Sequence, residues 1–452
     1  MTRLPLLIAV IGLLEAVRAL GSRDSSPMHG TLLAFGVVVL AAFFASKVAG
    51  TVKLPKLTGY LALGMIVGPP VLGLLTEEMV QTLKWVNYTA VSLIALTAGG
   101  EISFKELRPL MKSIAAISGI AVVGTMFLLA FGVFVLQLAF PARLPFFEPL
   151  SIGQTLAVCL LLGVALAAQS PAVVVALLDE TGADGPVSRT ALGVVVLADI
   201  LVIVVFAVAM SIAQAAVRST ADVGDTTLDV LWEVLGSMAA GALVGGLLAI
   251  YLRFVPRGAA LFVIVVCIVI AEVGSRLDLD PLIVALTAGI VVRNLSSMAG
   301  RLIQEIEAGS LPLYVLFFAV AGAGIHLDAL PTVAIPAVAL IVLRSAGLLG
   351  GSVLASRLAG APNGVSRFVG FGLLPQAGLA LALADYVDRA FPEFRPIATS
   401  LIVTIIALNE LIAPIAFRIA IVRSGEAGKK VVEPPQPISG VEQTLAAEIT
   451  PP

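Results

Sequence analysis

The chain has 452 residues, of which 59% are hydrophobic and only 12% are charged. Since a soluble domain averages roughly 45–50% apolar and about 25% charged residues, this composition excludes an ordinary soluble protein and predicts an all-α integral membrane protein. The net charge of -2 argues against a nucleic-acid partner and leaves the lipid bilayer as the expected surroundings.

Apolar blocks of the length that a helix needs to cross a bilayer follow one another from residue 30 onward. Pro, Gly and charged residues divide them into thirteen expected spans. These are 30–50, 54–76, 85–104, 113–140, 153–180, 188–217, 228–252, 258–277, 280–297, 310–328, 331–357, 366–389 and 396–421. The segment 1–29 is apolar but short, and we expect a membrane-embedded helix there, a fourteenth span. An interfacial helix or a signal sequence are the alternatives.

The Lys and Arg residues predict the orientation of the chain. They are more numerous in the loops that follow odd-numbered spans than in the opposite loops, which places the former loops and the C-terminus in the cytoplasm. The polar, Pro-containing residues 424–452 predict a disordered cytoplasmic tail. A short tail without a regulatory domain favours a bacterial inner membrane as the location.

Two of the expected spans, the fifth and the twelfth, are interrupted by polar residues next to proline. The interrupting residues are Gln169, Ser170 and Pro171 in the fifth span and Pro375, Gln376 and Gly378 in the twelfth. Matched interruptions predict two inverted six-helix repeats, spans 1–6 and 8–13, with two broken, crossing helices. Carbonyl groups freed at such breaks can steer an ion, and Gln169 and Ser170 would add weaker oxygen ligands. The alternative is that Pro and Gly are simply common in membrane helices.

Four ionisable residues lie well inside apolar blocks: Asp199, Glu272, Arg344 and Glu410. Such a residue costs about 2.5–3.5 kcal/mol at mid-bilayer on insertion scales, so its default interpretation is functional. Asp199 has no compensating charge within a helical turn. A buried carboxyl group exchanges its proton nearer to neutral pH than an exposed one, and a cation would compete for the same oxygens. We therefore expect Asp199 to bind both; a structural aspartate paired with a neighbouring helix is the alternative.

Arg344 stays protonated at any relevant pH and needs a counter-ion. We predict a structural ion pair between Arg344 and Glu272, which leaves Asp199 free to titrate; Glu410 and Asp199 are the other available acids. Glu410 is also a candidate site residue. Glu101 is expected inside the third span or at its cytoplasmic edge, more as a solvated helix end than as a ligand.

The chain offers little support for an enzyme. Cys159 and Cys267 both lie in apolar blocks and are expected to be buried thiols, and two histidines are too few for a metal cluster. The sequence contains no HExxH, GxSxG or GxxxxGK[ST] pattern. We expect no cofactor and no metal beyond a transported cation.

Five stretches of the chain resemble motifs of the monovalent cation:proton antiporters, the superfamily of sodium/proton exchangers and potassium-efflux antiporters. They read "LPKLTGYLALGMIVGPPVLGLL", "TAGGEISFKEL", "SLPLYVLFFAVAGAGIHLDAL", "LLPQAGLALALA" and "LNELIAPIAFRIAI". The resemblance implies an antiporter domain over 30–423 in a homodimer. A core domain, about 113–217 and 331–421, would move against a dimerisation domain, about 30–104 and 258–328.

The resemblance also implies site residues. The proton-carrying and cation-binding aspartate of the family's sixth span matches Asp199, and Glu272 and Arg344 match positions where some exchangers form an ion pair. Two departures stand out. The residue before the aspartate is usually Asp in electrogenic members and often Asn in electroneutral ones, and here it is Ala198; the family's Thr-Asp-Pro at the first break here reads Gln-Ser-Pro. One titratable acid implies one proton per cation, with Na+ or K+ left open.

These observations favour a secondary active transporter that exchanges Na+ or K+ for a proton, as in pH homeostasis. A potassium channel-like pore or a regulatory membrane subunit on the same scaffold is the alternative. An organic-anion symporter is disfavoured by the span count and by Asp199, and an intramembrane enzyme by the absence of any catalytic motif.

Overall fold

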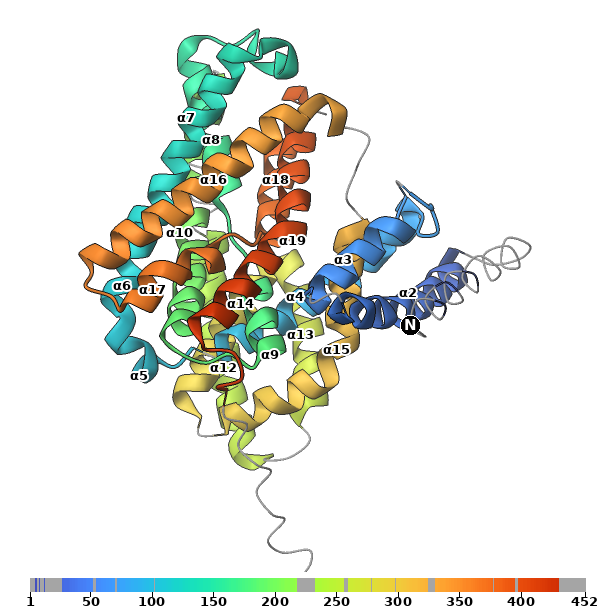
Figure 1. The fold of residues 1–452 in the computed structure, drawn as a ribbon. Coiled ribbons are helices and arrows are strands. Elements are labelled where there is room, and N and C mark those ends of the chain that lie inside the picture. The colour runs from blue at the N-terminus through green and yellow to red at the C-terminus, as the bar shows by residue number, and fades with distance from the viewer. Residues whose placement is uncertain are drawn as a thin grey trace, which may run out of the picture.

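The described part of the chain is built entirely of helices and their connections (Figure 1). This computed structural model describes residues 27–51, 54–69, 71–100, 102–217, 232–255, 259–277, 279–296, 298–323, 330–376, 378–394 and 397–430, together with the single positions 5, 8 and 12. The predicted embedded helix within residues 1–29 falls almost wholly outside these ranges, as does the predicted site residue Glu101.

The first half of the chain supplies most of the helices around the first break. They are α2 (Pro27–Thr51), α3 (Lys56–Val67), α4 (Glu77–Gly100), α5 (Phe104–Leu107), α6 (Met111–Ile117), α7 (Val123–Ala139), α8 (Ile152–Ala167), α9 (Pro171–Thr181) and α10 (Pro186–Val217). Short 3-10 or π-helical segments are η1 (Arg108–Leu110), η2 (Ser118–Val122), η3 (Pro141–Arg143) and η4 (Pro145–Phe147).

The second half contains the second break and the last described helix. Its helices are α12 (Ser237–Phe254), α13 (Ala259–Arg276), α14 (Pro281–Leu295), α15 (Ala299–Ala323), α16 (Leu330–Leu358), α17 (Asn363–Phe368), α18 (Gly378–Ala390) and α19 (Ile397–Ser424). The short segments are η5 (Trp232–Gly236), η6 (Val369–Leu373) and η7 (Pro392–Phe394).

Within the described residues, six helical stretches are long and apolar enough to cross a membrane. They are Arg108–Ala139, Ile152–Thr181, Pro186–Val217, Ser237–Phe254, Val333–Leu358 and Ser400–Ser424; shorter apolar helices are Val38–Thr51, Thr58–Val67, Leu261–Gly274 and Ile283–Leu295. The all-α, membrane-type architecture is therefore confirmed, whereas the thirteen spans and the inverted repeats remain predictions.

The stretch that contains the first break is the most enclosed. In the most apolar 18 residues of Ile152–Thr181, 89% are buried inside the protein. The corresponding share in Val333–Leu358 is 33%. The α16 side chains Val338, Val342 and Leu354 are exposed, as expected for a helix that faces lipid. The broken backbone thus lies inside protein, the one place in a membrane where freed polar groups find partners.

The helices pack in two groups. In the first, α8 contacts α7 and α10, and α16 contacts α7, α19 and η6; in the second, α3 contacts α2 and α15, and α14 contacts α4 and α12. Figure 1 shows α7, α8, α16 and α18 on one side of the molecule and α2, α3 and α15 on the other. The division into a core and a dimerisation domain remains a prediction.

Backbone-to-backbone contacts hold the second group together. A Cβ atom at Gly99 of α4 would collide with the carbonyl oxygen of Leu286 in α14, and one at Gly289 of α14 would collide with that of Leu96 in α4. Helices in lipid gain little from hydrophobic burial against one another, so close backbone packing is a main source of their association. Since α14 lines the cavity described below, these contacts fix one of its walls.

The described chain does not become unstructured where the tail was predicted to begin. Glu426 is buried, and the backbone N–H of Gly428 donates to the Thr181 carbonyl at 2.9 Å. The predicted start of a disordered tail at residue 424 is therefore wrong for residues 424–430, because an acid in this segment binds backbone amides far away in the sequence. Residues 431–452 lie outside the described part.

Two adjacent glycines on α12 give a matched test of this packing. A Cβ at Gly245 would lie 2.6 Å from the Ala288 carbonyl oxygen of α14, whereas one at Gly246 would meet nothing within 4 Å. Overpacking of this kind costs about 1–3 kcal/mol, while Ala in an open helical position is better than Gly by about 1 kcal/mol. We expect Gly245→Ala to lower the unfolding temperature of the detergent-purified protein and Gly246→Ala to leave it unchanged or raise it. Equal effects of the two substitutions would contradict the packing.

Candidate functional site

The first break separates α8 from α9. The helix α8 ends at Ala167, and α9 begins at Pro171 after an extended connection. The Ser170 side chain accepts a hydrogen bond from the Val173 backbone N–H at 3.2 Å, so it acts as the N-cap of α9. Pro171 occupies the first helical position, where its missing N–H costs nothing. Ser170 thus stabilises the start of α9, whether or not it also binds an ion.

The second break separates η6 from α18. The segment η6 ends at Leu373, and α18 begins at Gly378, so Pro375 and Gln376 lie in the connection. The buried Gln376 side chain crosses to the first break, where its Nε2 donates to the Leu166 carbonyl at 2.9 Å. The two breaks are therefore in direct contact through side chains.

Arg344 of α16 binds both breaks at once. Its guanidinium is fully buried. Nε donates to the Leu166 carbonyl at 2.9 Å and Nη2 to the Ala168 carbonyl at 2.8 Å, on the first break. Nη1 donates to the Leu374 carbonyl at 2.7 Å and Nη2 to that of Leu373 at 3.4 Å, on the second. Carbonyl groups at the end of a helix carry partial negative charge, so these two ends provide the compensation that Arg344 needs.

The predicted ion pair between Arg344 and Glu272 is wrong. Glu272 accepts a hydrogen bond at 3.0 Å from Nε of Arg276, four residues further along α13. Its side chain is 39% exposed, whereas Arg344 is inside the protein and bonds to carbonyl oxygens. The correct partners are backbone atoms, which become available only because two helices are broken at the same place.

The residue Asn409 of α19 completes this network, and the sequence analysis missed it. Its Nδ2 donates to the Gln376 Oε1 at 2.6 Å. The one available signal was its position beside the embedded acid Glu410. Because Gln376 in turn binds the first break, α19 is tied to both interruptions.

Several buried polar groups at predicted site positions have no hydrogen-bond partner. The Asp199 side chain is buried with both carboxylate oxygens unpartnered, and Gln169 is buried with both amide atoms unpartnered. The Glu410 Oε1 atom is also buried without a hydrogen-bond partner. Leaving such a group unsatisfied costs about 1–3 kcal/mol, more if it is charged, so each requires an explanation beyond the fold itself.

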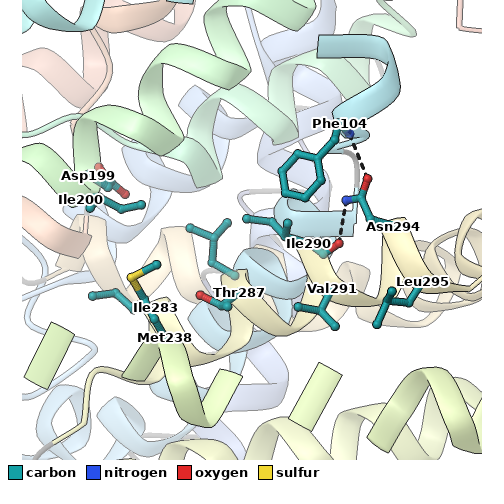
Figure 2. A pocket seen from close by; sticks show the side chains of 11 residues that line it. Phe104, Asp199, Ile200, Met238, Ile283, Thr287, Ile290, Val291, Asn294 and Leu295 are labelled. Atoms are coloured by element: carbon teal, nitrogen blue, oxygen red, sulfur yellow. Dashed lines mark hydrogen bonds between the residues drawn. The ribbon is translucent and has the colours of Figure 1, made fainter. Parts of the chain in front are cut away.

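Asp199 lines a cavity of about 370 Å³ between α10, α12 and α14. Figure 2 shows Asp199 and Met238 at one end of the cavity and Phe104 and Asn294 at the other, with Thr287 and Ile290 between them. Most lining residues are apolar. The carboxylate is the acidic group among them, so an ion that enters the cavity finds its strongest ligand at Asp199.

The far end of the cavity is held by Asn294 of α14. Its Oδ1 accepts from the Phe104 N–H at 2.9 Å, and its Nδ2 donates to the carbonyls of Ile102 at 2.9 Å and Ile290 at 2.8 Å. The dashed lines in Figure 2 mark two of these bonds. Asn294 was not predicted as a site residue, because a polar residue in the last turn of an expected span is common at helix ends.

A second acid, Asp280, interacts electrostatically with Asp199. Its Oδ1 accepts from the Ile283 N–H at 3.3 Å, and its own N–H donates to Ser237 Oγ at 2.8 Å, so it caps the start of α14. Two acids near one another attract a cation more strongly than one. Asp280 was not predicted as a site residue, because it lies at the edge of an expected span, where acids are common.

Metal-ligand clusters and disulfides do not occur in the described ranges. Cys159 and Cys267 are buried free thiols, as predicted. No three His, Cys, Asp or Glu side chains of the described residues lie together in a way that could hold a metal ion.

The chain belongs to the sodium/hydrogen exchanger family, whose transmembrane-domain model matches residues 37–422. It is 26% identical over 397 residues to the iron transporter MagA of Paramagnetospirillum magneticum, across 85% of each chain. It is 25% identical over 356 residues to the Na(+)/H(+)-K(+) antiporter GerN of Bacillus cereus, across 77% of this chain and 85% of that protein.

The fold is similar to a solved structure, that of the sodium proton antiporter MjNhaP1 from Methanocaldococcus jannaschii. The TM-score is 0.65 at 18% sequence identity, over 88% of this chain and all of that one (100%). The family match, the relative GerN and this fold together confirm the predicted membership of the monovalent cation:proton antiporter superfamily. The family and the apolar helices together make the chain a multi-pass membrane protein.

The observed partners of Arg344 lead to a mutational prediction. Arg344→Ala leaves several buried carbonyl groups without a donor, and hydrogen bonds to a charged group are worth about 1.5–3 kcal/mol each. We expect Arg344→Ala to lower the folded yield and the unfolding temperature in detergent strongly. Arg344→Lys should restore them only in part, because an ammonium group cannot reach both breaks with the planar fork of a guanidinium.

Glu272→Ala is the matched control for this prediction. Its side chain is half-exposed and paired within α13, so we expect the folded yield and unfolding temperature to stay at wild-type values. A loss as large as that of Arg344→Ala would support the predicted ion pair between Arg344 and Glu272 and contradict the carbonyl partners seen in the structure.

Proposed function

We propose that the protein is a secondary active transporter that exchanges a monovalent cation for a proton, and that the two compete for Asp199. The observation that carries this proposal is a buried carboxylate without a hydrogen-bond partner at the wall of a cavity. Membership of the sodium/hydrogen exchanger family supports the same chemistry.

The competition follows from the cost of burying charge. In apolar surroundings a protonated carboxyl group is tolerated, and an ionised one is tolerated only beside a cation. Asp199 in the described structure has no cationic side chain bonded to it. The change between the two access states is therefore favourable when Asp199 carries a proton or a cation. It is unfavourable when Asp199 is ionised and carries neither. The negative charge of Asp280 nearby adds to the attraction for the cation.

We further propose a one-for-one, electroneutral exchange of Na+ or K+. The residue beside Asp199 is Ala198, so Asp199 is the single acid on α10, and Asp280 at the start of α14 is engaged in capping that helix. The name of GerN mentions both Na+ and K+, and that of MagA mentions iron. The choice of a monovalent ion follows from the sodium/hydrogen exchanger family and from the name of GerN.

Alternating access is proposed to move a core, about residues 113–217 and 331–421, against a dimerisation part, about 30–104 and 258–328, in a homodimer. One contact between these groups supports a defined end state. The Glu180 carboxylate of α9 accepts from the Lys56 backbone N–H, the first residue of α3, at 2.9 and 3.1 Å. A sliding core would break this contact and reform it in each cycle.

Proton release on addition of a cation tests the proposal. In everted membrane vesicles with a pH-sensitive dye, we expect Na+ or K+ to release protons through the wild type. Asp199→Asn should abolish the signal, because an amide neither carries the proton nor balances a cation. Glu272→Gln changes an acid on another helix and should exchange normally. Unchanged exchange by Asp199→Asn refutes the mechanism, and cation flux without proton movement favours the alternative, a potassium channel-like pore or a regulatory subunit.

Electroneutrality is a separate prediction. A cycle that exchanges one positive charge for another moves no net charge, so the exchange rate in proteoliposomes should not depend on an imposed membrane potential. The potential is set with a gradient of the membrane-permeant anion thiocyanate, which is no substrate of a cation exchanger, while cation-driven proton movement is followed. A rate that rises when the potential is made favourable to proton entry would show that more than one proton accompanies each cation.

A further inference from the structure

Residues 425–430, which we call the C-terminal strap, follow α19 directly and pack against the turn between α9 and α10. The Asp184 N–H donates to the Glu426 carbonyl at 3.2 Å, and the Lys430 N–H donates to the Gly182 carbonyl at 2.8 Å. The Lys430 ammonium forms an ion pair with Asp179 at 2.8 Å. The strap thus lies against both helices that meet at this turn.

The carboxylate of Glu426 occupies the start of α10. Its Oε1 accepts from the Val187 N–H at 2.7 Å, and its Oε2 accepts from the Ser188 N–H at 2.8 Å and the Ser188 hydroxyl at 2.7 Å. The first N–H groups of a helix have no partner within it, and a negative charge there is favourable. An acid from the end of the described chain therefore caps the helix that carries Asp199.

The turn itself is shaped for this contact. A Cβ at Gly185 would strike the Glu426 carboxyl group, so the absence of a side chain there makes room for it. Arg189 donates to both oxygens of Asp184 at 2.7 and 2.9 Å. This pairing holds the pKa of the Asp184 carboxyl below its usual value, so the pair stays ionised at neutral pH.

The start of α10 is connected to the candidate site through one continuous helix. The helix is continuous from Pro186 to Val217, and Asp199 lies eleven residues beyond Ser188, about 16 Å along the axis. Between them, a Cβ at Gly372 of η6 would lie 2.8 Å from Cβ of Ala191, so α10 packs directly on the second broken segment. Close-packed interiors transmit a shift rather than absorb it.

We propose that Glu426 is a positioning residue for cation binding: by capping α10 from the C-terminal strap, it fixes Asp199 at the wall of the cavity. This rests on the proposed function, in which Asp199 binds the cation. A cap that merely stabilised the fold would, when removed, lower the amount of active protein and hence the maximal rate. A positioning cap also changes the cation concentration at half-maximal rate.

The test measures both quantities with the full chain in proteoliposomes, with Na+ as the cation and an internal pH dye. Glu426→Ala should raise the half-saturating Na+ concentration by about five- to tenfold. That is the effect of about 1–1.4 kcal/mol on binding. Glu426→Gln should give a smaller rise, since its amide oxygen still accepts one of the bonds. Lys429→Ala, an exposed position of the strap, should leave the concentration unchanged. A Glu426→Ala value within twofold of the wild type overturns the proposal, whatever the maximal rate.

A second pair of variants decides the matter if Glu426→Ala does not fold. Gly185→Ala displaces the carboxylate without altering it, whereas Gly364→Ala places a methyl group in ordinary contact, 3.9 Å from the Val187 side chain. We expect only Gly185→Ala to raise the half-saturating concentration, and equal values for the two overturn the proposal. If the wild type exchanges neither Na+ nor K+, the proposed function fails; if it exchanges Na+ and these variants show the same half-saturating Na+ concentration, only the positioning role fails.

Discussion

The guanidinium of Arg344 and the carbonyl groups around it form the interaction on which the rest of the structure depends. Breaking two membrane helices side by side exposes backbone groups that lipid cannot satisfy. One planar cation with several donors satisfies four carbonyl groups from both breaks. Gln376 and Asn409 extend the network to α19. A long, always charged side chain is thus a condition for having irregular backbone at this depth.

This arrangement separates structural charge from functional charge. Arg344 is satisfied by dipoles and makes no hydrogen bond to an acid, which leaves the Asp199 carboxylate without a protein partner. The cavity beside it has a wall, α14, fixed through glycine contacts to α4 and through Asn294 to the start of α5. Asp199 therefore belongs to a helix, α10, whose start is capped by Glu426, and it faces a cavity wall, α14, that close contacts hold in place.

The sequence was informative where a single residue carries the signal. An aspartate alone in an apolar block and a proline in a span can be recognised without a fold, so Asp199 and the interruptions at Pro171 and Pro375 were predicted. The partner of Arg344 was not, because the choice of an acid assumed that charge must meet charge. Freed carbonyl groups belong to no residue type and become visible only in three dimensions. Glu426 was missed for the same reason: its partners are backbone amides 238 and 239 positions away.

The contact between Glu180 and the backbone of Lys56 has a consequence for comparisons among relatives. An acceptor that binds a backbone N–H places no demand on the side chain at the other end, so position 56 can vary while the contact persists. Covariation between pairs of positions, which reveals side-chain partners in an alignment, is therefore blind to it. The same holds for Arg344 on its carbonyl groups, and for Glu426 at Val187. In a family alignment, Glu180, Arg344 and Glu426 would therefore look like constant residues without co-varying partners.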